Sequence, residues 1–479
     1  MSITLNLKRS TDFFGLTIRP TLAPETVTLE TAGKDVGDIR MIGGKAVLSL
    51  GAQNKLSAEM LRRAGGSLAK WLAKNSVSEA GVELGLVLGT GMPPSTALTA
   101  FVEGLLLGAF TFGLYKAENE DKATALSLLL DGNTGPSASL RTGVGESELR
   151  GYIQKATITA EAVNLSREWA HEPPNVINPV TLAERVQKLA AEIGLKCTVL
   201  DDKQLTEMGA GAIVAVGKGS TNSPSRLIIL EHAGKTGGKP VALVGKSLTM
   251  DTGGYSLKGG EHIVGMKYDK SGGMTVIATL VAAARLGLAT PVVGVIAAAE
   301  NMVSAAAYRP DDILKALNGK TIEIISTDAE GRLVLADALT YTERTFQPRA
   351  MIDIATLTGA VVVALGSVRA GVLSTSDELA EALFQSGEKT FERVWRLPLD
   401  EEYFEQIKGD DSDIKNSGGR KAGSIIGGMF LKQFVTDVTP WAHVDVAGMA
   451  DTDKELPYCP KGGVGFGVRL FLDYLDSLE

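Results

Sequence analysis

The stretch PVALVGKSLTMDTGG, residues 240–254, determines how the second half of this chain is interpreted. Its Gly245-Lys246-Ser247 resembles the end of a phosphate-binding loop, whose pattern is G-x-x-x-x-G-K-[ST]. The first glycine of that pattern is replaced by Pro240, and an apolar Val-Ala-Leu-Val run follows. Such a run is typical of a buried strand and not of a loop that wraps a phosphate. We therefore expect Lys246 at the carboxyl end of a buried strand, where the active sites of parallel sheets lie.

Strands and helices alternate along the chain from about residue 175. Val/Ile-rich runs bounded by glycine or proline alternate with helical runs such as GGMTVIATLVAAARLG; the strand-like runs are RLIILEH, PVALVGK, PVVGVIAAAE and RAMIDIATLTG. This alternation predicts an α/β fold with a central, mostly parallel mixed sheet flanked by helices.

The length of 479 residues favours two domains of unequal size. A stretch rich in Gly, Ser and Thr at 129–148 precedes a long helical pattern that Pro173-Pro174 ends. We predict a smaller N-terminal α/β domain at 1–146, a linker helix at 147–174 and a larger catalytic α/β domain at 175–479. In the first of these, KAVLSLG and VELGLVLG indicate buried strands.

Composition and charge narrow the class of protein. The net charge is −8 and the pI about 5.4, which argues against a large nucleic-acid footprint. Two isolated cysteines and the lack of a secretory pattern in the first residues favour a reducing, cytoplasmic location. Glu103 interrupts the most apolar run, so we expect a buried helix there and no membrane span.

Lys246 is followed by further charged residues in a glycine-rich segment. Asp251, Lys258 and Asp269 lie in KSLTMDTGGYSLKGGEHIVGMKYDKSGG, where paired glycines allow tight turns. Such a loop can direct acidic and basic side chains towards one point.

A second charged cluster lies in STDAEGRLVLADAL. Asp328, Glu330 and Arg332 are two residues apart, so in an extended chain their side chains share one side. The alternative is a polar edge strand or a helix N-terminus rich in acid. Apolar residues flank the cluster, which indicates that the segment enters the core, where acids need compensation.

Four carboxylates in one pocket would repel one another and take up protons unless cations balance them. Two divalent cations would do so if Lys246 were neutral, and a neutral amine is itself a metal ligand. The four histidines form no H-E-x-x-H motif, and no G-x-S-x-G elbow is present. The candidate metal ligands are Lys246, Asp251, Asp269, Asp328 and Glu330.

At these residues the sequence resembles the leucyl aminopeptidase family of cytosolic two-metal aminopeptidases. The family signature N-T-D-A-E-G-R-L appears as Ser326-Thr327-Asp328-Ala329-Glu330-Gly331-Arg332-Leu333. Other matching segments follow in the family order, over roughly residues 150–479: VGKSLTMDTGGYSLK, MKYDKSGG, AENMVSAAAYRPDDIL, IDIATLTGA and WAHVDVAG. The likeness is weaker in the first 130 residues.

The resemblance implies a role for each of these residues. Asp251 and Glu330 would bridge two divalent ions, zinc or manganese and possibly magnesium or cobalt. Lys246 and Asp269 would complete one metal site and Asp328 the other. Lys258 would polarise the scissile carbonyl, and Arg332 would hold a bicarbonate ion that acts as general base.

The resemblance also implies the reaction and the assembly. A metal-bridging hydroxide would release the N-terminal amino acid, with a possible leucine-like preference, from peptides with a free N-terminus. Met266, Thr356 and Ala450 would line the pocket for the first side chain. A homohexamer built as a dimer of trimers is expected.

Alternatives and departures from the family pattern remain. A nucleotide-binding enzyme built on Lys246 and a nucleic-acid-binding regulator on the same scaffold are the rival functions, although the acidic composition makes nucleic acid an unlikely partner. Tyr255 and His262 depart from the family pattern, and their roles stay open.

Overall fold

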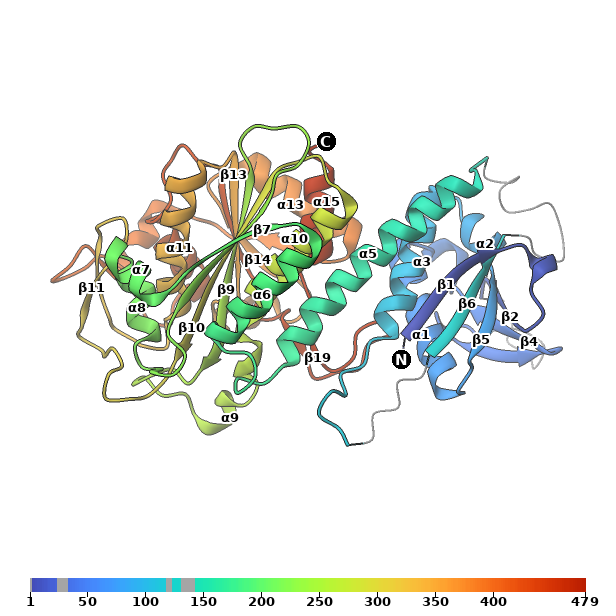
Figure 1. Cartoon of the computed structure of the whole chain (residues 1–479), viewed down its shortest axis with the longest axis horizontal. Coiled ribbons are helices and arrows are strands. Elements are labelled where there is room, and N and C mark those ends of the chain that lie inside the picture. The colour runs from blue at the N-terminus through green and yellow to red at the C-terminus, as the bar shows by residue number, and fades with distance from the viewer. Residues whose placement is uncertain (1, 24–32, 118–122, 131–142) are drawn as a thin grey trace. The chain divides into compact units, whose positions relative to one another are not determined.

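The computed structural model describes residues 2–23, 33–117, 123–130 and 143–479 (Figure 1). The chain forms two compact units, Met1–Asn164 with Thr452–Lys461 and Leu165–Asp451 with Gly462–Glu479. The Gly/Ser/Thr-rich stretch expected at the domain boundary lies, in its central part 131–142, outside the described residues. The predicted domain boundaries at 146 and 174 stay a prediction.

The first unit contains one six-stranded sheet, in the order β1-β6-β5-β2-β4-β3. Its strands are parallel except for the β3–β4 pair. The strands are β1 (Ser2–Lys8), β2 (Leu16–Thr21), β3 (Ile39–Ile42), β4 (Lys45–Ser49), β5 (Glu79–Glu83) and β6 (Ala123–Leu129). The helices are η1 (Ser10–Asp12), η2 (Gln53–Lys55), α1 (Ala58–Lys74), α2 (Gly85–Leu88) and α3 (Pro94–Gly108). Helix α5 (Glu146–His171) begins in this unit.

Two sequence predictions for this unit have different outcomes. Glu103 lies in α3 and is buried against Arg62 of α1, with Nε to Oε2 3.0 Å apart, so the apolar run is a buried helix as expected. None of the helices in the described part of the chain combines the length and apolar character needed to span a bilayer. The strand predicted for VELGLVLG is wrong beyond Glu83, because Gly85–Leu88 forms α2. A short apolar run fits a buried helix as well as a strand.

The second unit contains an eight-stranded sheet in the order β15-β14-β17-β13-β9-β10-β8-β7. Its strands are β7 (Lys196–Leu200), β8 (Arg226–His232), β9 (Val241–Asp251), β10 (Val292–Asn301), β13 (Ala350–Ala355), β14 (Ala370–Ser374), β15 (Val394–Arg396) and β17 (Trp441–Asp445). The short strands of this part of the chain are β11 (Ile313–Lys315), β12 (Thr321–Glu323), β16 (Ile414–Lys415), β18 (Asp451–Thr452) and β19 (Gly462–Gly463).

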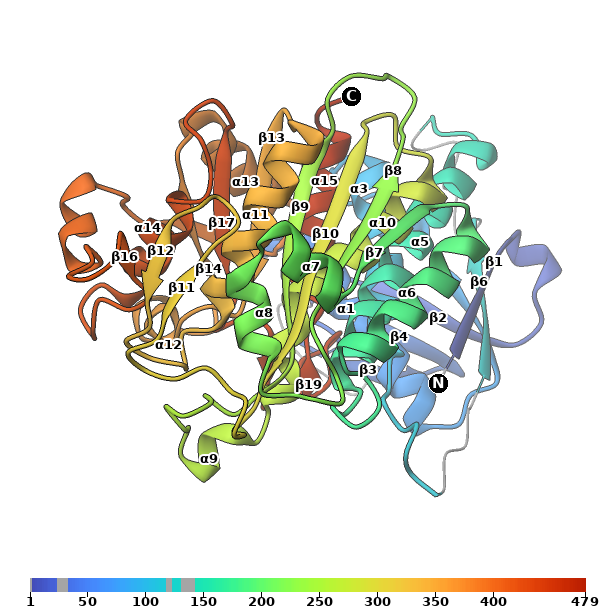
Figure 2. The same cartoon turned by 60° about the vertical axis from the view of Figure 1, so that its left-hand side comes forward.

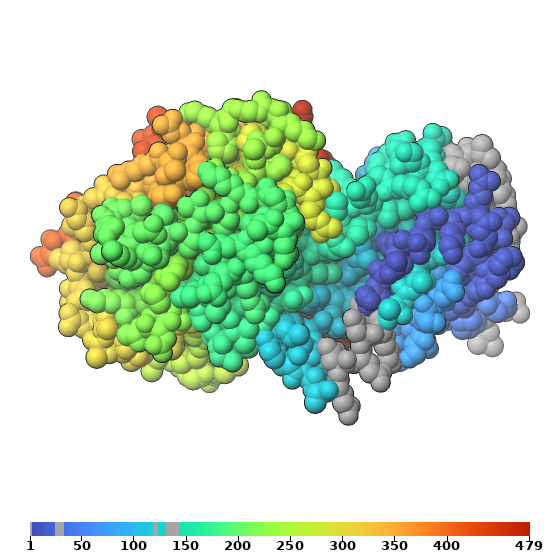
Figure 3. Space-filling view, in the orientation of Figure 1, coloured from blue at the N-terminus to red at the C-terminus, as the bar shows by residue number. Residues whose placement is uncertain are grey.

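The helices of the second unit cover both faces of this sheet. They are α6 (Pro179–Ile193), α7 (Asp202–Met208), α8 (Gly211–Gly217), α9 (Gly260–Ile263), η3 (Met266–Lys270), α10 (Ser271–Leu286), α11 (Gly331–Phe346), α12 (Gly359–Leu365), α13 (Asp377–Thr390), η4 (Glu401–Gln406), α14 (Gly423–Lys432) and α15 (Val468–Asp476). Figure 2 shows β9, β10 and β8 side by side. In Figure 3 the green surface includes the region of α6 to α8; α6 packs on β7 and β8, and α8 packs on β10 and α11.

The four central strands β17, β13, β9 and β10 are parallel, and antiparallel pairs occur towards both edges. The prediction of an α/β fold with a mostly parallel mixed sheet is therefore confirmed. The strands are apolar without alternation because helices bury both faces; every residue of β13 and β10 is buried.

Glycines set how closely α10 lies against β9. A Cβ added at Gly245 would lie 2.7 Å from Gly273 Cα and 2.8 Å from Gly272 O. A Cβ added at Gly273 would in turn lie 2.7 Å from Ser247 Cβ. The glycine that resembled part of a phosphate loop therefore serves close strand–helix packing, which places α10 and the residues before it beside Lys246.

We expect Gly245→Ala to destabilise the protein, because the new methyl group meets backbone atoms that cannot rotate away. Overpacking of this kind costs about 1–3 kcal/mol. The denaturation midpoint of the variant should fall, measured by urea unfolding followed by fluorescence. Gly151→Ala in α5, where an added Cβ meets nothing within 4 Å, is the control and should keep or raise the midpoint. Equal midpoints for Gly245→Ala and the wild type would contradict the packing role.

Candidate metal centre and active site

Strand β9 carries two of the predicted ligands because it is longer than its neighbour β13. The two strands pair only as far as Ile354 and Gly245, whereas β9 continues alongside β10 to Asp251. Lys246 is therefore not at the end of its own strand, as the sequence suggested, but one residue past the last pair that β9 makes with β13. Asp251 is at the true end of β9. Both face the carboxyl edge of the sheet.

The 328–332 segment is not extended. Asp328 lies in a turn, Glu330 is the N-cap residue of α11, and Arg332 is in the first helical turn. The prediction that alternate residues share one side is thus wrong here, and the alternative of an acidic helix N-terminus is correct. Gly331 begins the helix; a Cβ there would lie 2.7 Å from Lys246 Nζ, so the small residue leaves room for the lysine.

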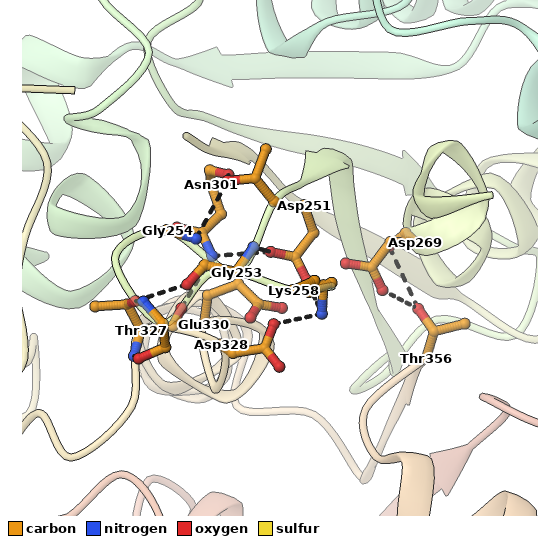
Figure 4. Close-up of polar contacts among 12 residues, drawn as sticks. Asp251, Gly253, Gly254, Lys258, Asp269, Asn301, Thr327, Asp328, Glu330 and Thr356 are labelled. Atoms are coloured by element: carbon orange, nitrogen blue, oxygen red, sulfur yellow. Dashed lines mark hydrogen bonds and ion pairs between the residues drawn. The ribbon is translucent and has the colours of Figure 1, made fainter. Parts of the chain in front are cut away.

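The five predicted ligands lie together. Figure 4 shows the four carboxylates among them, Asp251, Asp269, Asp328 and Glu330. Carboxylate oxygens of Asp251, Asp328 and Glu330 lie within 4.8 Å of one another. Lys246 Nζ lies 2.8 Å from Asp269 Oδ1 and 3.0 Å from Glu330 Oε1. All but Asp328 are buried.

Lys258 belongs to the same cluster. Its Nζ lies 2.8 Å from Asp251 Oδ2 and also pairs with Asp328 Oδ1. Four carboxylates therefore share two ammonium groups, which leaves an excess of negative charge. Among the described residues, Asp269 Oδ2 and Glu330 Oε2 are buried without a hydrogen-bond partner. Buried oxygens of this kind are costly unless something positive satisfies them, so the donor set fits divalent cations.

Burial and the neighbouring negative charges raise the pKa values of two acids of the cluster, Asp251 and Asp269. Burial raises the pKa of Asp251 to about 6 and that of Asp269 to about 7. Burial also disfavours the charged form of Lys246, but Asp269, Glu330 and Asp251 outweigh it and raise the pKa of Lys246. Lys246 is thus an ammonium when no cation is bound, and a cation that it ligates takes the place of a proton.

Neutral groups that the sequence analysis did not single out hold the acids in place. Asp251 Oδ1 accepts hydrogen bonds from Gly253 N, at 2.9 Å, and from Asn301 Nδ2, at 2.8 Å. Asn301 Nδ2 also donates to Thr327 O, at 2.9 Å, which ties Asp251 to the segment of Asp328. Asn301 lies in the AENM segment at the end of β10. Because this segment matches the family pattern, it was the feature of the sequence that could have indicated a role for Asn301 at the site.

The charged cluster forms one end of a cleft of about 550 Å³. Its members there are Lys246, Asp251, Lys258, Asp269, Asp328 and Glu330. Met266 and Thr356 of the predicted substrate pocket line it, together with Leu357, Val362 and Ala447. Ala450 is buried, and the alanine that contributes to the lining is Ala447. His262 lies exposed at the cleft wall beside Glu261. Tyr255 donates to Ser304 O on an exposed surface.

Arg332 is buried behind the cluster. Its Nη1 donates to Asn416 O, at 2.8 Å, and its guanidinium carbon lies 5.9 Å from the centre of the Phe430 ring. Its Nε is among the buried atoms of the described residues that lack a partner. Burial lowers the pKa of Arg332 to about 10. A buried cation with an unused donor suits a small anion.

Comparison with known proteins gives consistent matches. A model of the cytosol aminopeptidase family, catalytic domain, matches residues 164–472, and one of the N-terminal domain of that family matches residues 45–119. The probable cytosol aminopeptidase of Syntrophotalea carbinolica is 43% identical over 455 residues, which are 95% of this chain and 88% of the relative. The probable cytosol aminopeptidase of Aquifex aeolicus is 42% identical, with the same coverage.

A solved structure is similar over nearly its whole length. The bottromycin maturation enzyme BotP in complex with Mn has a TM-score of 0.86 and 30% identity to this chain. The match covers 97% of this chain and 99% of that one.

Asp269→Asn should alter the pH dependence of stability in protein stripped of metal by chelation. The pKa of Asp269 is about 7 in the folded protein against 3.8 in a free side chain. The folded state therefore binds the proton more tightly, and this group lowers stability as pH rises between those values. Asn carries no charge, so the thermal midpoint of the variant minus that of the wild type should be larger at pH 8 than at pH 5. A difference that does not vary with pH would show that Asp269 is ionised throughout.

Proposed function

This chain belongs to the cytosol aminopeptidase family and is a metal-dependent peptidase, and on that premise we propose that it removes N-terminal amino acids from peptides by two-metal hydrolysis in the cleft described above. One observation carries the proposal. Four carboxylates and two lysines, supplied by distant segments of the chain, surround one end of a cleft, and two buried oxygens there lack a partner.

The ligand roles follow the family pattern and agree with the geometry. Asp251 and Glu330 are the proposed bridging ligands, as the family pattern implies; Asp251 lies beside Lys258 and Glu330 beside Lys246. Lys246 and Asp269 lie 2.8 Å apart and would hold one cation with them. Asp328, on the cleft side, would complete the other site. When bound, two divalent cations supply Lewis acidity and activate a water nucleophile near neutral pH.

The preferred metal is proposed to be manganese or zinc, with magnesium or cobalt as weaker substitutes. The ligands are carboxylate oxygens and one amine, with no thiolate, which suits the harder ions of this group. The Mn complex of the similar enzyme BotP supports manganese as the first ion to test.

Lys258 has the position of an oxyanion-stabilising group. Its Nζ lies between Asp251 and Asp328, and its side chain is 16% exposed at the cleft. Burial opposes its charge, but the acids, Asp251 first, raise the pKa of Lys258, so it stays a cation. A fixed ammonium of this kind can stabilise negative charge on a peptide carbonyl oxygen.

Arg332 is proposed to hold a bicarbonate ion, which would supply a general base when bound. The unpartnered Nε and the buried guanidinium support anion binding, although Arg332 lies behind the cluster.

The cleft accepts the first residue of a peptide in this proposal. The lining beyond the charged cluster includes the apolar side chains of Met266, Leu357 and Val362. Such a wall favours an aliphatic side chain of leucine-like size. The acidic end would meet the free α-amine of the substrate, which an internal peptide bond does not offer.

Cytoplasmic location and assembly as a homohexamer, a dimer of trimers, are further proposals that rest on the family resemblance. Size-exclusion chromatography with light scattering tests the assembly.

We expect chelation to abolish cleavage of aminoacyl anilides and dipeptides, and added Mn²⁺ or Zn²⁺ to restore it. Glu330→Ala should lose activity and metal content together, because a shared ligand disappears; the loss should be on the order of 1,000-fold or more. Metal content by mass spectrometry and initial rates measure both effects. Glu207→Ala, at an exposed carboxylate on α7, is the control.

Other outcomes would favour the rival functions. Protection from thermal unfolding by ATP, without any metal-restored cleavage, would favour a nucleotide enzyme. Salt-sensitive DNA binding that survives Lys258→Ala would favour a regulatory role. Full activity in Glu330→Ala would contradict its bridging role.

Lys258→Ala separates catalysis from metal binding. Because Lys258 is assigned to the substrate carbonyl, kcat should fall by about 100- to 1,000-fold while metal content stays near that of the wild type. Lys203→Ala, at a lysine 83% exposed on α7, should change neither quantity. A Lys258→Ala variant that keeps its kcat but loses metal would reverse the assignment.

A further inference from the structure

Asp445, in the WAHVDVAG segment, ends strand β17 and is completely buried. Its Oδ1 accepts hydrogen bonds from the backbone N–H groups of Leu357 at 3.1 Å, Thr358 at 3.4 Å and Ala447 at 3.2 Å. Its Oδ2 accepts from Thr358 Oγ1 at 2.7 Å. One carboxylate therefore holds two separate loops of the chain.

Both loops belong to the cleft. Leu357, Thr358 and Ala447 all line it. Thr358 also accepts a hydrogen bond from Val361 N, at 3.2 Å, and so begins helix α12, which carries Val362 on the cleft wall. Asp445 thus determines where two parts of the lining stand relative to each other.

The residue before this turn contacts two candidate metal ligands. Lys246 Nζ donates to Thr356 O, at 2.9 Å. Thr356 Oγ1 donates to Asp269 Oδ1, at 2.6 Å. Thr356 therefore orients the amine and the carboxylate that are assigned to one metal, and the adjoining Leu357 and Thr358 are fixed by Asp445.

We propose that Asp445 is a positioning residue: through the 356–358 turn it sets the orientation of Lys246 and Asp269 and so the affinity of the metal site they form. The inference rests on the metal centre proposed above. The hydrogen bonds of Asp445 go to the turn and to Ala447 and not to the ligands, and its negative charge also stabilises the charged form of Arg332. Groups that orient metal ligands typically change metal affinity or activity by about 10- to 100-fold when removed.

The neighbouring strand offers a matched control. Asp353 lies on β13, directly opposite His443 of β17, and is as deeply buried as Asp445. Its carboxylate accepts from Trp441 Nε1, at 2.8 Å, and contacts His443 Nδ1 at 2.5 Å, so its bonds stay within the sheet. Substituting Asp353 perturbs a buried carboxylate without releasing the turn.

The test uses full-length protein stripped by a chelator and then titrated with Mn²⁺, with free Mn²⁺ measured by electron paramagnetic resonance. Asp445→Ala should weaken one of the two Mn²⁺ sites by about 10- to 100-fold. Asp445→Asn should lose less, because its amide oxygen can still accept the backbone bonds. Asp353→Asn should lower the thermal midpoint but leave both Mn²⁺ affinities unchanged.

Thr358→Val keeps the side-chain shape and removes the hydroxyl that donates to Asp445. This variant replaces Asp445→Ala in the test if Asp445→Ala does not fold. It should weaken the same Mn²⁺ site. Wild-type Mn²⁺ affinity in a folded Asp445→Ala or Thr358→Val variant overturns the inference, as does an equal loss in Asp353→Asn. A wild-type protein that binds Mn²⁺ but cleaves no peptide overturns the proposed reaction, and the Mn²⁺ comparison still decides the role of Asp445.

Discussion

An excess of buried negative charge is the constraint on which the centre of this protein depends. Asp251, Asp269 and Glu330 are buried and Asp328 lies beside them, and in the described part of the chain their ion pairs are with two lysines, Lys246 and Lys258. A buried carboxylate must be paired, protonated or bound to a metal, because it has lost its hydration. The raised pKa values of Asp251 and Asp269 and the unpartnered oxygens express that imbalance. Bound cations would offset the free-energy cost of burying these carboxylates together.

The fold delivers these charges to one place by unequal strand lengths and by glycines. Because β13 stops where β9 continues, Lys246 emerges from the sheet while its strand is still held by β10. Gly245 admits α10 against β9, and Gly331 lets the start of α11 pass close to the Lys246 side chain. Glu330, at the start of α11, thus lies 3.0 Å from Lys246 Nζ. Close packing, and not a phosphate, accounts for the glycine beside Lys246.

A layer of hydrogen bonds beneath the cleft connects the sheet to the charged cluster. Asp445 fixes the turn after β13, Thr356 in that turn contacts Lys246 and Asp269, and Asn301 joins Asp251 to the segment of Asp328. Each link is between groups that are far apart in the sequence. The cluster is therefore held by the ends of four adjacent parallel strands, which agrees with the general location of active sites in such sheets.

The sequence by itself determined the kind of fold and the identity of the candidate ligands. Apolar runs separated by helical periods specify a parallel sheet, and the STDAEGRL and VGKSLTMDTGG segments specify which acids and lysines are present, because those are properties of local pattern and residue type. Only the tertiary structure decided that Asp328 and Glu330 lie in the turn and at the N-cap that begin α11. It also decided that residues 452–461 belong to the first unit. The supporting roles of Asp445, Thr356 and Asn301 likewise appear only in the tertiary structure. These depend on strand register and on contacts over tens to hundreds of residues. A local sequence pattern does not show how many residues one strand extends beyond the last pair with its neighbour, because that depends on the pairing of distant segments.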